Sequence, residues 1–426
     1  MKAPKSDQPE FCKSLDGLYR SKMRVLFVSN LFPPAFLGGY ELECAQVAEH
    51  LHALGHEVAV ISTQDPNNQS SSYPFSVYRT MKLIKDFTIP IHRTERINRW
   101  KTSNYNYNMT QKAIEDFSPD CVFLWSMLRI GVGPAFAAQD AGIPIAWRFG
   151  DENIAGFRST PKGKTPISFL KHLIDEHILK RSTISGLNFT HTSCISQLTK
   201  KRLIESGIPI QKAEIHYKGI PIELFPMKKN PGKLSQPLKI LHVGQLHDYK
   251  GVFVLQKAID LLALSIPVEL TYIGSGPKEI EERLHHFANK SQAKVTFKGK
   301  LPYESLGAEY RQYDIFIFPS LWEEPQGTSY LEAMASGVPV ISTSNGGQKE
   351  ILENGKTALF YDKDNPKALL QQVEKVTHNN TLRQELVSNA RALVEQNYSL
   401  NTYVKQIETF LKSACTHKEK ANESVS

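Results

Sequence analysis

The sequence predicts an α/β protein built from two doubly wound, Rossmann-like domains, each with a parallel sheet and helices on both faces. Short apolar runs rich in β-branched residues alternate with helical patterns, as is typical of such sheets. This alternating series occurs twice, before and after a polar Pro/Gly stretch at residues 228–237. The length of 426 residues also agrees with two or three domains. We expect the two domains to face each other across a cleft.

The first series begins with an apolar run at residues 24–29, which reads as a buried strand. A Pro/Gly loop at 32–39, a helical pattern at 41–54 and a second strand at 57–62 follow. This βαβ unit implies parallel strands with a right-handed crossover. Further strands are expected at residues 121–125, 144–149 and 187–192.

The second series has the same character, with strands expected at residues 238–243, 268–273, 295–297, 314–318 and 338–341. The predicted division of the chain follows from the two series and the stretch between them. It comprises a flexible polar leader (1–22), an N-terminal domain (23–227), a linker (228–237), a C-terminal domain (238–400), and a final helix with a polar tail (401–426).

Composition limits the class of protein. Hydrophobic residues make up 41% and charged residues 22%, which excludes a disordered or collagen-like chain. The five cysteines are scattered without CxxC spacing, which favours a reducing compartment and excludes a disulfide framework. No apolar run is long enough to span a bilayer, so we expect a cytoplasmic protein.

The net charge of +8 is concentrated in the first half, where residues 1–220 hold 27 Lys and Arg against 20 Asp and Glu. An anionic partner is one interpretation, with peripheral contact at the inner face of an anionic membrane favoured over nucleic acid, which we do not expect. A solvated basic face is the other. Two segments are candidates for contact with an anionic partner: the basic and aromatic region 92–112, and the amphipathic segment 169–181. A helix packed on the sheet is the alternative for both.

The strongest chemical signal is the stretch of residues 319–341. It places Glu324 in a loop after a strand and Glu332 in the following helix, with seven residues between them. Gly327, Thr328 and Ser329 stand where that helix should begin. Free amides at a helix N-terminus suit phosphate oxygens, and a carboxylate can accept sugar hydroxyls. Together these groups match the parts of a nucleotide-sugar.

This stretch resembles the Glu-x7-Glu signature of retaining glycosyltransferases of family 4, which have the GT-B fold. The segments 331–341 and 346–351 are similar to the same family, and the resemblance extends from about Met23 to near Lys412. It implies that Glu324 contacts the transferred sugar and Glu332 the ribose hydroxyls. One departure is Gln326, where the family usually has Phe.

A second group lies at residues 243–251, a strand followed by a polar loop. The resemblance implies that Gln245 and Lys250 face the donor pyrophosphate. A cation there would stabilise the diphosphate leaving group. Lys250 fits this role, whereas the family commonly has Arg in place of the uncharged Gln245.

In the N-terminal half, Gly38 and Gly39 resemble the family's glycine loop, which approaches donor phosphate and acceptor. Asp151 stands at the aspartate of a His-Asp landmark, and Gly150 takes the place of its histidine. A helix cap or turn is the alternative for Asp151. The histidines at 172 and 177 do not form HExxH, and we predict no metal site.

The sequence therefore predicts a retaining, metal-independent hexosyltransferase, with Lys250, Glu324 and Asp151 as catalytic residues. Gly38, Gly39, Gln245, Lys250, Gly327, Thr328, Ser329 and Glu332 would bind the donor. No cofactor is expected beyond the nucleotide-diphosphate-sugar co-substrate. The acceptor would be a carbohydrate or lipid-linked molecule in polysaccharide or glycolipid assembly. A GT-B nucleotide-sugar epimerase and a non-catalytic nucleotide-sugar-binding scaffold are the alternatives.

Overall fold

The computed structural model describes residues 22–64, 72–85, 95–159 and 165–423, and its contacts divide the chain into two compact units. The first unit comprises residues up to Ser193 together with Gly207–Lys212 and the segment from Glu408 onward. The second comprises Cys194–Ser206 and Ala213–Ile407. The predicted leader, residues 1–22, lies outside the described residues except for Lys22.

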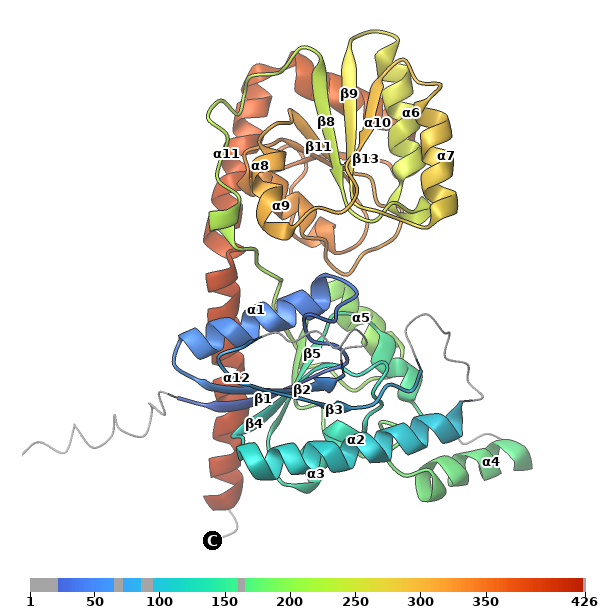
Figure 1. Ribbon diagram of the computed structural model, residues 1–426, viewed down its shortest axis with the longest axis vertical. Coiled ribbons are helices and arrows are strands. Elements are labelled where there is room, and N and C mark those ends of the chain that lie inside the picture. The colour runs from blue at the N-terminus through green and yellow to red at the C-terminus, as the bar shows by residue number, and fades with distance from the viewer. Residues whose placement is uncertain (1–21, 65–71, 86–94, 160–164, 424–426) are drawn as a thin grey trace, which may run out of the picture. The chain divides into compact units, whose positions relative to one another are not determined.

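The first sheet lies mostly in the first unit and has seven strands in the order β3-β2-β1-β4-β5-β6-β7. The pairings from β3 to β5 are parallel, with Val25 opposite Val58 and Cys121. Helix α1 lies on one face and helices α2 and α3 on the other (Figure 1). The elements are β1 (Arg24–Ser29), α1 (Gly39–Ala53), β2 (Glu57–Thr63), β3 (Ser76–Met81), α2 (Arg96–Phe117), β4 (Cys121–Ser126), α3 (Gly133–Asp140), β5 (Ile145–Phe149), η2 (Asn153–Phe157), α4 (Pro166–Leu173), η3 (Ile174–Ile178), β6 (His191–Cys194), α5 (Gln197–Glu205) and β7 (Glu214–Ile215).

The second sheet has six parallel strands in the order β10-β9-β8-β11-β12-β13. One core lies between this sheet and helices α6, α7 and α10, and another between the sheet and α8, α9 and α11 (Figure 1). The elements are η4 (Ile222–Leu224), β8 (Leu238–Val243), η5 (Asp248–Lys250), α6 (Val252–Ala263), β9 (Val268–Ile273), α7 (Lys278–Ala288), β10 (Lys294–Phe297), η6 (Tyr303–Ser305), α8 (Leu306–Tyr310), β11 (Ile315–Phe318), α9 (Ser329–Ala335), β12 (Val340–Thr343), η7 (Gly347–Glu350), β13 (Leu359–Tyr361), α10 (Pro366–His378), α11 (Asn380–Asn397) and α12 (Leu400–Glu423).

Both sheets thus have the doubly wound strand order, in which the fourth strand in sequence pairs with the first. This confirms the predicted fold class. The bounds of the last strand predicted in the first series are wrong, since β6 begins at His191 rather than at 187. Asn188 closes a turn there by accepting from the amide of Thr190 at 2.8 Å.

The predicted domain boundary at 227/228 differs from the observed division. Residues from Ala213 onward pack within the second unit, where the Ile220 amide donates to Tyr398 O at 2.9 Å and Phe225 is fully buried. The predicted linker is also anchored there. The buried carboxylate of Asp314 accepts from the amide of Ser235 at 3.0 Å and lies 3.8 Å from Lys228 Nζ. Buried partners therefore hold a segment whose composition suggested a free linker.

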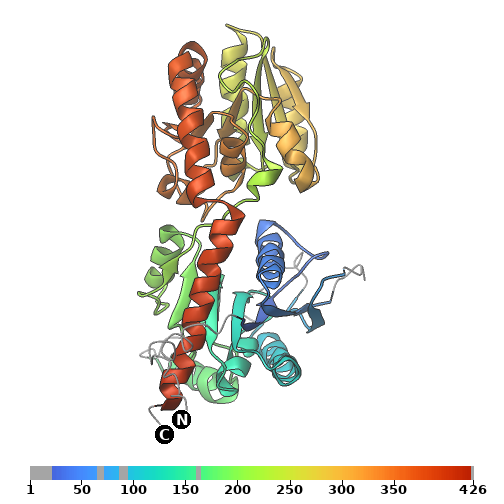
Figure 2. The same ribbon diagram turned by 90° about the vertical axis from the view of Figure 1, so that its left-hand side faces the viewer.

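The final helix is longer than predicted, and its part from Glu408 onward belongs to the first unit. There the Phe410 ring lies 6.4 Å from the ring of Phe123 on β4, and Glu408 Oε1 lies 3.1 Å from His56 Nε2. Figure 2 shows this part of α12 lying against the first unit.

Candidate functional site

The carboxyl ends of β8, β11 and β12 bring three loops of the second unit together. These strands are neighbours in the sheet and run parallel, so their ends share one edge. The loop after β8 carries Gln245 and Lys250, and the loop after β11 carries Glu324. The amides of Leu321 and Trp322 both donate to Tyr249 O, at 2.9 and 3.1 Å, which ties the two loops to each other.

Lys250 and Glu324 form an ion pair at this edge, with Nζ 2.9 Å from Oε1. Their side chains are only 17% and 9% exposed, so the pair is largely removed from water. Within the described part of the chain, the ion pair with Lys250 is the contact that Glu324 Oε1 makes. Removing the two charges from water costs free energy, which their mutual attraction at this distance offsets.

Aromatic rings enclose this ion pair. The Lys250 ammonium lies 5.6 Å from the Tyr249 ring centre and 5.5 Å from that of Trp322. Burial raises the pKa of Tyr249, and the Glu324 charge adds to the effect. The surroundings therefore strengthen electrostatic interactions at this edge.

The glycine motif at 346–351 contacts the backbone of Glu324. The Gly347 amide donates to Glu324 O at 2.7 Å. A Cβ at position 347 would lie 1.8 Å from Pro325 O, so only glycine permits this close approach. The motif thus fixes the backbone of the loop that carries the carboxylate.

Glu332 lies in a separate, buried network. It is on α9, and its Oε2 accepts from the Tyr310 hydroxyl at 2.8 Å. Burial raises the pKa of Glu332, while hydrogen bonds from Tyr310, Tyr303 and Thr328 and the charge of Lys218 oppose the shift. Of the two glutamates of the motif, Glu324 is thus the one placed with Lys250.

The remaining predicted donor residues have structural partners. Gln245 Oε1 accepts from the Tyr249 hydroxyl at 3.0 Å. Thr328 takes the N-cap position of α9, which begins at Ser329, without a side-chain hydrogen bond to the helix amides, and Gly327 packs against the Phe318 ring. Gln326, the departure from the family pattern, accepts from the Lys218 amide at 2.7 Å and donates to Lys218 O at 3.0 Å. The glutamine amide therefore anchors the segment around residue 218.

Sequence reasoning missed two contacts beside this site. Arg202 Nη2 of α5 lies 2.6 Å from Glu323 Oε2, next to Glu324. Glu350 accepts from the first two amides of α5, those of Gln197 and Leu198, at 2.8 Å each. The partners are more than 100 residues apart in sequence. No local pattern could have indicated them.

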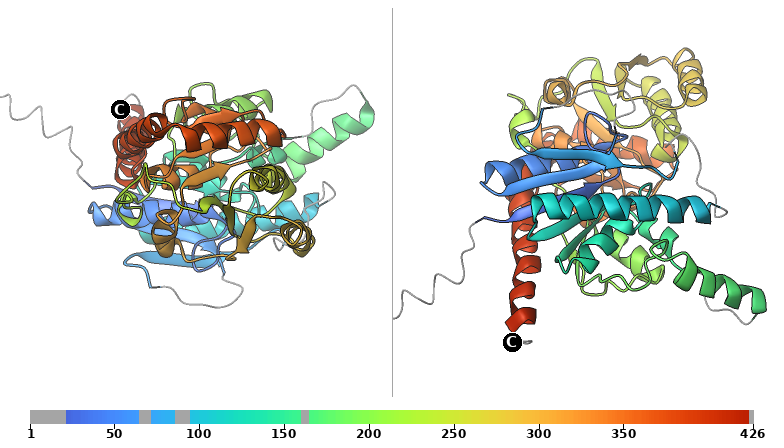
Figure 3. Two further views of the ribbon diagram at one scale, coloured as in Figure 1. Left: turned by 90° about the horizontal axis from the view of Figure 1, so that it is seen from above. Right: turned by 60° about the horizontal axis from the view of Figure 1, so that its bottom comes forward.

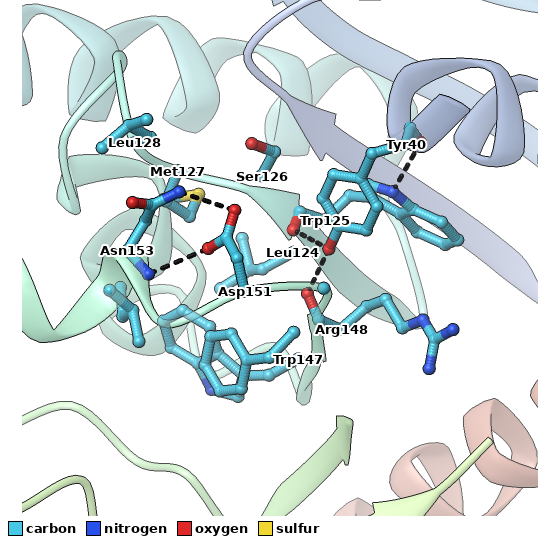
Figure 4. A pocket seen from close by; sticks show the side chains of 13 residues that line it. Tyr40, Leu124, Trp125, Ser126, Met127, Leu128, Trp147, Arg148, Asp151 and Asn153 are labelled. Carbon is cyan, nitrogen blue, oxygen red and sulfur yellow. Dashed lines mark hydrogen bonds between the residues drawn. The ribbon is translucent and has the colours of Figure 1, made fainter. Parts of the chain in front are cut away.

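Asp151 lines a small pocket of the first unit, with a cavity volume of about 20 Å³, between the carboxyl ends of β4 and β5 (Figure 4). Its two oxygens accept from the amide and the side chain of Asn153, at 2.9 and 2.6 Å. Burial raises the pKa of Asp151, against the effect of these two hydrogen bonds. The Arg148 side chain points away from the pocket and lies 3.1 Å from Glu43 Oε1.

Tyr40 fills the space beside Gly150 in this pocket. Its hydroxyl lies 2.7 Å from both Trp125 O and Arg148 O. A Cβ at position 150 would lie 2.6 Å from Tyr40 Cε2. The tyrosine ring thus occupies the side of Gly150 where the family's histidine would begin. Gly38 and Gly39 lie just before it, at the start of α1, where the Gly38 amide donates to Glu41 at 3.1 Å.

Two kinds of feature are absent from the described residues. No group of three His, Cys, Asp or Glu side chains is placed there to hold a metal ion. None of the described helices combines the length and apolar composition that crossing a membrane requires.

Residues 226–393 match the family described as glycosyl transferases group 1, and every predicted site residue of the second unit lies within that segment. This segment is less than half of the chain, and together with the two doubly wound sheets the match agrees with the GT-B fold. The finer assignment to family 4 stays a prediction.

Individual proteins are similar to the chain at low sequence identity. Spore coat protein SA of Bacillus subtilis is 29% identical over 167 residues, which cover 37% of this chain and 44% of that protein. The chain thus spans less than half the length of that relative. An uncharacterized glycosyltransferase of Methanocaldococcus jannaschii is 23% identical over 92% of this chain and 98% of its own length. The crystal structure of Anabaena HepE in complex with UDP has a TM-score of 0.67 at 19% identity, covering 92% of this chain and 100% of that chain.

Proposed function

We propose that the chain is a retaining glycosyltransferase that moves a hexose-type sugar from a nucleotide-diphosphate-sugar to an acceptor hydroxyl. The observation that carries the proposal is the Lys250–Glu324 ion pair at the carboxyl edge of the second sheet. This pair lies in the segment that matches group 1 glycosyltransferases. HepE of Anabaena, which shares the fold, was crystallised with UDP.

In this proposal the donor diphosphate displaces Glu324 from Lys250. The ammonium then neutralises the negative charge that develops on the leaving diphosphate, and the freed carboxylate accepts hydroxyls of the transferred sugar. The aromatic rings around Lys250 reduce solvent screening and so increase this stabilisation. Glu332 keeps its predicted role toward the ribose, which it would share with the Tyr310 hydroxyl.

The acceptor side of the proposal rests on the pocket of Asp151. Burial raises the pKa of this carboxyl, which favours a group that takes a proton from a hydroxyl. We assign a carbohydrate or lipid-linked acceptor to this reaction, in polysaccharide or glycolipid assembly. Gly38 and Gly39 lie at the start of α1, close in sequence to the Tyr40 wall of the same pocket.

The test uses the full chain with UDP-, GDP- and ADP-sugars and an acceptor panel, with the product's anomeric configuration determined by NMR. Lys250→Ala should lower kcat/KM by about 10²–10³-fold, and Glu324→Ala should be similarly impaired. Lys257→Ala, an exposed lysine of the same unit, serves as the control and should retain activity. Inversion of configuration, or full activity of Lys250→Ala, would contradict the proposal.

Two other outcomes identify the alternatives. An altered free nucleotide-sugar without acceptor transfer would indicate an epimerase. Donor binding without turnover would indicate a scaffold, an interpretation that the uncharged Gln245, hydrogen-bonded to Tyr249, favours.

Metal independence is part of the proposal, because Lys250 supplies a positive charge at the place assigned to the diphosphate. Activity should therefore persist after dialysis against EDTA. Loss of activity that Mg²⁺ or Mn²⁺ restores would overturn this part.

A further inference from the structure

Exposed apolar side chains gather on α4 and the π-helical turn η3 that continues it. Ile167, Leu170 and Ile178 are 68%, 58% and 66% exposed, and Phe169 is 43% exposed. Single exposed apolar residues are ordinary, whereas four within one short helical segment call for an explanation.

The sequence places these residues on one face. Ile167, Leu170, Ile174 and Ile178 follow one another at intervals of three and four, as expected for an apolar stripe along a helix. Packing of this stripe on the sheet, the alternative weighed for segment 169–181, is ruled out by the exposure of Leu170 and Ile178. Figures 1 and 3 show α4 reaching outward from the first unit, near one end of α2.

Basic residues outnumber acidic ones in the segments that carry the stripe and the start of α2. The segments 95–101 and 165–181 together hold six Lys and Arg against three Asp and Glu. The end of the second segment contacts α2 just beyond the first segment, since Asn104 Nδ2 of α2 donates to Lys180 O at 3.4 Å and the Arg181 guanidinium lies 3.7 Å from the Tyr107 ring centre. Ile97, in the first turn of α2, adds another exposed apolar side chain.

We propose that this surface, formed by residues 165–181 and 95–101, docks on an anionic lipid bilayer. An apolar stripe flanked by Lys and Arg matches an interface in which acyl chains lie beneath negative headgroups. The excess of positive charge in residues 1–220 adds long-range attraction to the same partner. The inference rests on exposure and charge in the first unit and does not depend on the proposed reaction.

The experiment measures flotation of the full chain with phosphatidylcholine vesicles that contain or lack phosphatidylglycerol. The protein should float with the anionic vesicles, less so at high salt, and weakly with the zwitterionic ones. The triple variant Ile167→Ser, Leu170→Ser, Ile178→Ser should bind at least about tenfold more weakly. Lys101→Gln with Lys180→Gln should lower binding to anionic vesicles and leave the zwitterionic baseline unchanged.

The control is Leu264→Ser, which removes a 67% exposed leucine from the second unit and should bind like the natural chain. Thermal unfolding checks that each variant is folded, and light scattering reports its oligomeric state. The proposal is overturned if the natural chain does not float with anionic vesicles, or if the triple variant binds equally well. It is also overturned if the triple substitution converts a dimer to a monomer without changing flotation, because a second copy would then cover the stripe.

Discussion

The Tyr40 ring limits the size of the side chain that position 150 can hold, although the two residues are far apart in the sequence. The Tyr40 ring stands where a Cβ at position 150 would reach, at 2.6 Å. We therefore expect Gly150→His to lower the free energy of unfolding by about 1–3 kcal/mol through overpacking. The double variant Tyr40→Ala, Gly150→His should recover part of this loss, because the clash is gone. Urea unfolding of the single and double variants measures both effects.

A matched control is available a few residues away. A Cβ at Gly156 would meet nothing within 4 Å, so Gly156→Ala should be close to neutral. If Gly150→His proves as mild as Gly156→Ala, the ring of Tyr40 can move aside and the two positions are not coupled. A double-variant cycle separates this outcome from simple loss of tyrosine.

Glu332 gives the structure a pH dependence of known sign. Burial raises its pKa in the folded chain above the ordinary value of 4.5. Between these two values the folded chain holds more protons than the unfolded one, so the free energy of unfolding falls as pH rises through that window. In Glu332→Gln, which keeps an oxygen for the Tyr310 hydroxyl, this fall should be smaller. Urea titrations from pH 4 to 8 measure the difference.

Exposed Glu385 provides the comparison for this titration, because Glu385→Gln changes charge by the same amount on the surface of the same unit. It should leave the pH profile nearly unchanged. Equal profiles for Glu332→Gln and the natural chain would show that Glu332 ionises in the folded chain as readily as in the unfolded one.

At the scale of elements, Glu350 connects η7 to the start of α5. Its carboxylate accepts from the amides of Gln197 and Leu198 and from the Tyr217 hydroxyl at 2.9 Å. Glu350→Gln keeps the shape and puts an NH2 group against a donor, which should cost about 1–3 kcal/mol of unfolding free energy. Chemical denaturation measures it. Glu353→Gln, which removes an exposed pair with Lys356, should cost far less, and equal losses would refute the anchoring role.

Local patterns predicted the strands of the second sheet well, and the reason is their burial. Strands β8 and β9 have the predicted bounds, because an apolar run between polar loops is readable without its partners. Strand β3 was not predicted, since only Met81 of its six residues is buried and its side chains carry little apolar signal. Helix α2 was foreseen only as a basic, aromatic region. His92 and Arg93 of that region lie outside the described residues. Of its aromatic residues, Tyr105 on α2 has its ring centre 4.1 Å from Lys82 Nζ, so this ring contacts a basic side chain of the same unit.

For the candidate site, the chemical types of the residues were predictable but their pairing was not. Lys250 and Glu324 follow separate strands, and only the order β8-β11 makes their loops neighbours. Gln326 illustrates the limit further. Its side chain accepts a hydrogen bond from the backbone amide of Lys218, 108 residues earlier in the sequence. The motif around Gln326 gives no indication of this contact.

At the scale of the whole molecule, α12 divides its residues between the two units at Glu408. Because Phe410 is buried against β4, Phe410→Ala should lower the stability of the first unit by about 3–5 kcal/mol. The second unit should be unaffected, since Phe410 has no place in its core. Tryptophan fluorescence during urea unfolding can separate the two, because Trp322 belongs to the second unit and Trp100, Trp125 and Trp147 to the first.

In a Trp322→Phe background the fluorescence signal reports only the first unit, and its midpoint should shift to lower urea with Phe410→Ala. With Trp322 as the only tryptophan left, the midpoint of the second unit should stay in place. Thr409→Ala, at the preceding exposed position of the same helix, should move neither midpoint by much. If both midpoints fall together with Phe410→Ala, the long helix couples the units into one cooperative transition, and the division at Glu408 has no energetic meaning.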